Sequence, residues 1–152
     1  INPPIALYYM QGLNTTAVHA HGALYGVYGT LGLALTLFCL RAMQPERQWR
    51  SDILAFAFWA INIGMLLEIF LSLLPIGLLQ TYQSISEGYW SARSPEFMQT
   101  GIMQTLRWMR MVGDTIFAIG AIAWVLFALK IMLTRRGSSP APLLSSSQED
   151  TA

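Results

Sequence analysis

The chain has 152 residues and a formal net charge of +1, and only 11% of its residues are charged, against about 25% in soluble proteins. Hydrophobic residues make up 54%, which is more than a soluble domain of this size can bury. The basic residues form no long cluster, which excludes a nucleic-acid partner, and the single cysteine, Cys39, excludes a disulfide framework. The composition therefore predicts an integral membrane protein in contact with a lipid bilayer.

The first segment, residues 1–16, is uncharged and interrupted by two prolines and a glycine. Its apolar part is too short to cross a bilayer, so we predict an interfacial segment. The side-chain oxygens of Asn14, Thr15 or Thr16 can cap the helix that follows, because they accept hydrogen bonds from free N–H groups of its first turn.

Three apolar stretches follow, each longer than the ~20 residues that a helix needs to span the hydrocarbon layer. At 17–40, 53–79 and 111–133 they contain only three charged residues, Glu68, Asp114 and Lys130. We predict an all-α fold of three transmembrane helices at 17–42, 53–79 and 111–134, joined by loops at 43–52 and 80–110. Ser, Pro and acidic residues dominate positions 135–152, a composition that predicts a disordered tail.

The basic residues predict the orientation of these helices. Six of them lie in or next to the loop at 43–52 (Arg41, Arg47 and Arg50) or at the end of the third span and in the tail (Lys130, Arg135 and Arg136). Three, Arg93, Arg107 and Arg110, lie on the opposite side. Cytoplasmic segments carry the excess of Lys and Arg, so we expect residues 1–16 and 80–110 to lie outside.

The only two histidines, His19 and His21, stand at the start of the first span. At 100° per residue their side chains point ~200° apart, so they cannot chelate one ion. They serve either two centres on opposite sides of the helix or two polar contacts. Gly22, Gly26 and Gly29 share the His19 face, which lets a flat macrocycle or another helix approach closely.

The string Val18-His19-Ala20-His21-Gly22, which opens an apolar, glycine-rich helix, resembles the tenth helix of catalytic subunits of the haem–copper oxidase superfamily. Three longer strings resemble the large subunit of bacterial nitric oxide reductase. They are Ile1-Asn2-Pro3-Pro4 with Tyr8-Tyr9-Met10-Gln11-Gly12-Leu13-Asn14-Thr15-Thr16, Tyr89-Trp90-Ser91-Ala92-Arg93-Ser94-Pro95-Glu96-Phe97, and Leu106-Arg107-Trp108-Met109-Arg110-Met111-Val112-Gly113-Asp114-Thr115. The likeness covers residues 1–135.

The resemblance implies the C-terminal three helices of a roughly twelve-helix subunit in the bacterial cytoplasmic membrane. It implies two b-type haems, with His19 as proximal ligand of the high-spin haem and His21 as one axial ligand of the low-spin haem. Three histidines and a glutamate on earlier helices would hold a non-haem iron. The implied activity is reduction of nitric oxide to nitrous oxide, with a quinol or a cytochrome c subunit as donor. The quinol-dependent class is preferred.

Arg107 and Arg110 precede the third span, where the resemblance implies an arginine on a haem propionate. Alternatively, they cap the membrane interface and pair with Glu87, Glu96 or lipid phosphate. Asp114 heads the span, where a helix N-terminus favours a carboxylate, and the resemblance implies that it lies in the quinol pocket.

Glu68 is the only acid well inside a span. It serves either a proton route or a polar contact in helix packing, and we prefer the polar contact. Two other functions stay open for the chain. One is a fragment of a haem–copper oxygen reductase, with copper in place of non-haem iron. The other is a small non-catalytic membrane subunit whose histidines are merely polar.

The predicted topology can be tested by cysteine labelling of the intact protein after replacement of Cys39. A cysteine at Ser94 should react with an impermeant reagent added from the periplasm, and a cysteine at Ser139 only after the cytoplasmic face is opened. The reverse labelling pattern would invert the orientation.

Overall fold

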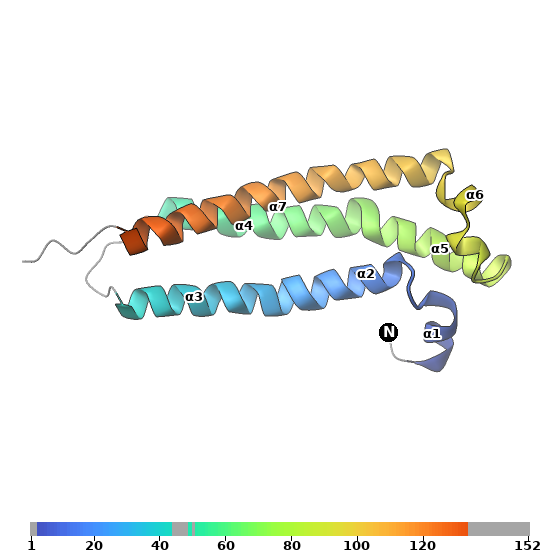
Figure 1. Ribbon diagram of the computed structural model, residues 1–152, viewed down its shortest axis with the longest axis horizontal. Coiled ribbons are helices and arrows are strands. Elements are labelled where there is room, and N and C mark those ends of the chain that lie inside the picture. The colour runs from blue at the N-terminus through green and yellow to red at the C-terminus, as the bar shows by residue number, and fades with distance from the viewer. Residues whose placement is uncertain (1–2, 44–48, 50, 134–152) are drawn as a thin grey trace, which may run out of the picture.

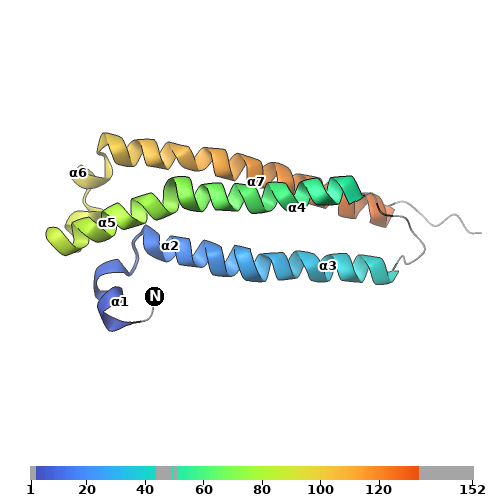
Figure 2. The same ribbon diagram turned by 180° about the vertical axis from the view of Figure 1, so that it is seen from behind.

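The computed structural model describes residues 3–43, 49 and 51–133, and every regular element in these ranges is helical. Three long helices lie side by side along the length of the molecule (Figures 1 and 2), and each is long and apolar enough to cross a membrane. The predicted all-α membrane fold with three transmembrane helices is confirmed. The predicted tail at 135–152 and most of the loop at 43–52 lie outside the described residues.

The first long helix consists of α2 (Asn14–Ala20), the π-helix η1 (His21–Gly29) and α3 (Thr30–Met43). The second consists of α4 (Ser51–Glu68), the π-helix η2 (Ile69–Leu73) and α5 (Leu74–Ser86), and the third is α7 (Gly101–Leu133). Short elements at one end of the molecule are α1 (Pro4–Met10), the 3-10 helix η3 (Ser91–Arg93) and α6 (Pro95–Met98).

Two helices extend further than the sequence predicts. The second long helix continues to Ser86 and α7 begins at Gly101, so both helices extend into the segment 80–110 that we predict as an outer loop. Hydropathy marks only the part of a helix that suits hydrocarbon, and these extensions are stabilised by packing instead. Gln80, Ser84 and Met103 are buried there although two of them are polar. Arg107 and Arg110 consequently lie inside a helix.

The first long helix is capped by a residue distant in sequence. The backbone N–H of Asn14 donates to the side-chain Oε1 of Gln80 on α5 at 2.9 Å. The hydroxyls of Thr15 and Thr16 donate to the carbonyl of Met10 instead. The expectation that Asn14, Thr15 or Thr16 supplies the cap is therefore wrong, because a tertiary contact satisfies the free N–H.

Two of the strings that resemble nitric oxide reductase meet at one end of the molecule. The hydroxyl of Tyr89 donates to the carbonyl of Gln11 at 2.6 Å, and Arg93 Nη1 donates to the same hydroxyl at 2.8 Å. Gly12 forms the turn after α1 with a φ of 73°, and a Cβ there would stand 3.3 Å from the Tyr89 hydroxyl. The N-terminal segment and the loop before α7 thus share one side, whichever face of the membrane it is.

The closest contact between the described helices is between α4 and α7, and glycines lie where the two helices touch. A Cβ at Gly113 would collide with the backbone N of Glu68, and a Cβ at Gly120 would lie 2.7 Å from the backbone N of Ile61. Gly64 faces the α7 backbone in the same way. Small residues let helices in lipid pack backbone against backbone, so these glycines fix how α4 and α7 are rotated toward each other.

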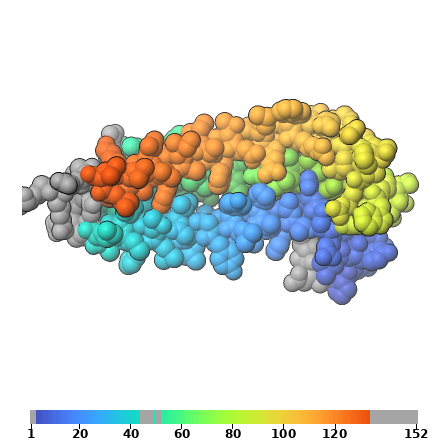
Figure 3. Space-filling model, in the orientation of Figure 1, coloured from blue at the N-terminus to red at the C-terminus, as the bar shows by residue number. Residues whose placement is uncertain are grey.

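The first long helix is mostly exposed and is held near its two ends. At one end α2 packs on α5, where a Cβ at Gly77 would lie 2.6 Å from the Thr15 backbone N. At the other end Leu40 joins a buried apolar cluster with Phe127 and Ile131 of α7. In the space-filling view, this helix lies along the lower side of the other two (Figure 3).

We predict that Gly113→Ala destabilises the intact subunit by ~1–3 kcal/mol, the usual cost of overpacking, because the new Cβ collides with the α4 backbone. Gly101→Ala is the matched control on the same helix, since nothing lies within 4 Å of a Cβ there. Thermal unfolding of the purified protein in detergent measures both. Equal midpoints for the two variants would contradict the close helix contact.

Candidate functional site

Four ionisable side chains from the three long helices meet in one cluster: His21 of η1, Glu68 of α4, and Arg110 and Asp114 of α7. Glu68 Oε1 lies 3.2 Å from His21 Nε2 and 2.8 Å from Arg110 Nη2. Arg110 Nε lies 3.3 Å from Asp114 Oδ2. Glu68 is buried, whereas the side chains of Arg110 and Asp114 are nearly half exposed. The arginine therefore connects a buried carboxylate to an accessible one.

The local backbone explains why these residues meet. Arg110 and Asp114 are one turn apart on α7, and Gly113 between them contacts the backbone of Glu68 directly. The two π-helices adjoin the cluster, since η1 begins at His21 and η2 begins immediately after Glu68. Such π segments occur frequently at functional sites, because the wider turn changes which way the following side chains point.

The imidazole of His21 has a defined orientation. Its Nδ1 lies 2.8 Å from the carbonyl oxygen of Ala17, one turn earlier. A carbonyl only accepts hydrogen bonds, so Nδ1 carries the proton in this contact. Nε2 is then the nitrogen that faces Glu68 and the space between the helices.

The cluster lines a cavity of about 250 Å³. Its walls also include Tyr25, Met65 and Phe117. Tyr25 and Phe117 line a second, more apolar cavity of about 280 Å³ as well, which continues along the space between the first long helix and α7. The rings of Tyr25 and Phe117 meet edge to face with centroids 6.1 Å apart. Aromatic side chains thus separate the polar cavity from the apolar one.

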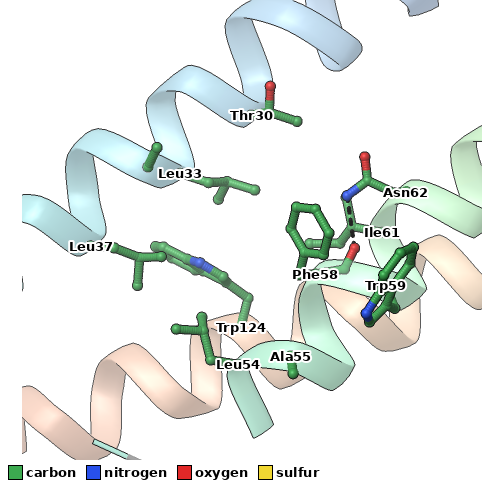
Figure 4. Close-up of a pocket in the computed structure, with 11 residues that line it drawn as sticks. Thr30, Leu33, Leu37, Leu54, Ala55, Phe58, Trp59, Ile61, Asn62 and Trp124 are labelled. Carbon is green, nitrogen blue, oxygen red and sulfur yellow. Dashed lines mark hydrogen bonds between the residues drawn. The ribbon is translucent and has the colours of Figure 1, made fainter. Parts of the chain in front are cut away.

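A third hollow is an apolar groove of about 440 Å³ between α3 and α4, with Trp124 of α7 between them (Figure 4). Thr30 and Asn62 line it, but each donates a hydrogen bond to its own helix, to the carbonyls of Gly26 and Phe58 respectively. The ionisable residues of the candidate site lie in the cavity beside His21.

Sequence reasoning selected five site residues, and the structure brings three of them together, namely His21, Arg110 and Asp114. His19 has an exposed side chain and contacts no polar group among the described residues. Arg107 is likewise exposed and without an ion-pair partner in the described part of the chain.

The expected carboxylate partners of the arginines are also different. Arg110 pairs with Glu68 and Asp114 rather than with Glu87 or Glu96. Sequence reasoning gave Glu68 a packing role and missed its central place in the cluster. One signal could have found it: a lone acid inside a span needs a partner, and Arg110 is a nearby cation on the neighbouring span.

Residues 1–116 match the family described as cytochrome c and quinol oxidase polypeptide I. The chain belongs to this family. The chain therefore belongs to an oxidoreductase of the haem–copper oxidase superfamily, which is a multi-pass membrane protein. Members of this family bind haems. The match includes every residue of the cluster and both histidines.

The residues present suit a haem better than a bare metal ion. Among the described residues, no group of three or more His, Cys, Asp or Glu side chains could hold a metal. An axial histidine, in contrast, needs one free ring nitrogen with the other held by a carbonyl or carboxylate. The Nδ1 of His21 is held by Ala17 and the ring borders an aromatic-walled cavity. Its Nε2 lies 3.2 Å from Glu68 Oε1, so a haem iron bound there would take the place of this contact.

We predict that Arg110→Gln destabilises the intact subunit by ~1–3 kcal/mol, because buried Glu68 loses its charged partner. Arg107→Gln removes the same charge from the same helix where no described residue pairs with it, so it should change stability little. Chemical or thermal unfolding of both variants measures the difference. A larger loss for Arg107→Gln would contradict the observed pairing.

Proposed function

We propose that this chain supplies one axial histidine to each of two b-type haems in a bacterial nitric oxide reductase. His21 is the ligand of the low-spin haem and His19 the proximal ligand of the high-spin haem. The observation that carries the proposal is the hydrogen bond from His21 Nδ1 to the Ala17 carbonyl, which leaves Nε2, now beside Glu68, as the nitrogen that would bind the iron. Metal-ligating histidines commonly have this arrangement.

The surroundings of His21 suit a large planar cofactor. The cavity beside it is walled by Tyr25 and Phe117, which also line the apolar cavity along the same helices. Bound haem would supply the electron transfer that the reduction needs. The chain's own residues orient the imidazole, exclude water with aromatic side chains and bring Arg110 to the edge of the cavity.

His19 would serve a second centre. Its side chain is exposed in this three-helix unit, whereas His21 contacts Glu68 in the interior. Residues two apart on a helix point in nearly opposite directions, so the two histidines cannot share one centre. The high-spin haem would then lie against the outer surface of this helix, between it and the rest of the same subunit.

The choice of nitric oxide as substrate rests on the resemblance of three strings in this sequence to the reductase. In the reaction two nitric oxide molecules, two electrons and two protons give nitrous oxide and water. The non-haem iron would take its histidine and glutamate ligands from the remainder of the subunit, in the bacterial cytoplasmic membrane. An oxygen reductase with copper at that position would use His19 and His21 in the same way.

Electron entry is proposed at Asp114. Its side chain is about half exposed, lines the cavity of the cluster and, among the residues that the structure describes, forms an ion pair with Arg110 alone. A carboxylate in this position can accept a hydrogen bond and a proton from a quinol hydroxyl. A cytochrome c subunit as donor would need no such acceptor. Arg107, which has no ion-pair partner among the described residues, and Arg110 are the candidate partners for haem propionates.

The histidine roles can be tested in the full-length subunit. His19→Ala should remove the high-spin haem signal and keep most of the low-spin spectrum, and His21→Ala should do the reverse. Each variant controls for the other, and optical and electron paramagnetic resonance spectra with haem quantification measure both. Two normally ligated haems in both variants would disprove the assignment. Nitrous oxide formation by the wild type supports the reductase, and oxygen uptake alone supports the oxygen reductase.

A further inference from the structure

One oxygen atom of Glu68 lies close to groups from two other helices. Oε1 lies 2.8 Å from Arg110 Nη2 of α7 and 3.2 Å from His21 Nε2 of η1. The side chain is only 8% exposed, in the middle of the second long helix. A buried carboxylate in a membrane helix costs free energy unless it is paired, so the ion pair with Arg110 stabilises Glu68 in this position.

Arg110 is shared unequally between two carboxylates. Its Nη2 lies 2.8 Å from Glu68, and its Nε lies 3.3 Å from Asp114, one turn along the same helix. The shorter contact is the one between helices. Without the Glu68 carboxylate, Asp114 would be the only acid among the described residues that pairs with the guanidinium. Arginine pairs with a carboxylate most strongly through two parallel hydrogen bonds.

Because Arg110 pairs with Glu68 as well, part of the Asp114 carboxylate stays available to accept hydrogen bonds from a ligand. Apart from Arg110, no described residue forms an ion pair or a side-chain hydrogen bond with the Asp114 carboxylate, and this side chain is 48% exposed beside the cavity. A carboxylate has about four acceptor positions, so most of them face open space. If Arg110 turned fully onto Asp114, its two hydrogen bonds would occupy about two of these positions and make the carboxylate a weaker acceptor.

We propose that Glu68 is a positioning residue for the quinol site. It holds Arg110 toward α4 and thereby keeps the Asp114 carboxylate open to a hydroquinone hydroxyl. The inference rests on the proposed function, in which Asp114 accepts that hydroxyl. It assigns Glu68 a role in donor binding, although Glu68 does not touch the donor.

The test measures turnover of the full-length enzyme with the soluble hydroquinone duroquinol as donor. Glu68→Gln keeps the shape of the side chain and removes its charge. We expect KM for duroquinol to rise about tenfold, kcat to stay within about twofold and the haem spectrum to be unchanged. Glu68→Asp keeps the charge on a shorter side chain and should give an intermediate KM. Glu87→Gln, an exposed acid at the end of α5, is the matched control and should leave both constants unchanged.

Because Glu68 acts through Arg110, its effect should vanish when Arg110 is absent. In an Arg110→Gln background, Glu68→Gln should therefore raise KM no further. A KM that is unchanged in Glu68→Gln and Glu68→Asp, an additive effect in the Arg110→Gln background, or haem loss in both Glu68 variants would each overturn the inference.

Asp114→Asn separates this inference from the proposed function beneath it. If Asp114→Asn leaves KM for duroquinol unchanged, the quinol site itself is wrong. If Asp114→Asn raises KM and Glu68→Gln does not, the site stands and only the positioning role of Glu68 fails.

Discussion

The direct backbone contact between α4 and α7 is the constraint on which the rest of the structure depends. Helices in lipid gain nothing from burying apolar side chains against each other, so close van der Waals contact and polar pairing must hold them together. Gly64 and Gly113 allow that approach, and the same contact brings Glu68 to Arg110. Packing and electrostatics thus support each other, because the glycines make the ion pair reachable and the pair stabilises a buried acid.

The first long helix is attached differently, and this difference creates room for function. Its ends are held by the Gln80 cap and by the apolar cluster around Leu40, whereas its middle borders successive cavities. The π-helix η1 begins at His21, at the point where the helix passes the ionic cluster. A helix that is fixed at its ends and loosely packed between them suits a cofactor that inserts between helices.

The boundaries of the elements illustrate where sequence reasoning succeeds and where it stops. Hydropathy located all three spans, because solvation in hydrocarbon depends on composition and length alone. It misplaced the ends of two helices around 80–110, where polar residues such as Gln80 are buried by packing. It also misassigned the helix cap, since the Gln80 side chain that caps Asn14 is 66 residues away.

The sequence by itself determined the membrane class, the three helices, the inability of His19 and His21 to share one centre, and the likeness to haem–copper oxidases. These follow from composition, helical periodicity and local strings of residues. Only the tertiary structure decided that Glu68, rather than a loop acid, is the partner of Arg110. Glu68 and Arg110 are 42 positions apart in the sequence, and their contact depends on the register and rotation of α4 against α7. Close packing at the glycines sets this register and rotation, and local sequence does not.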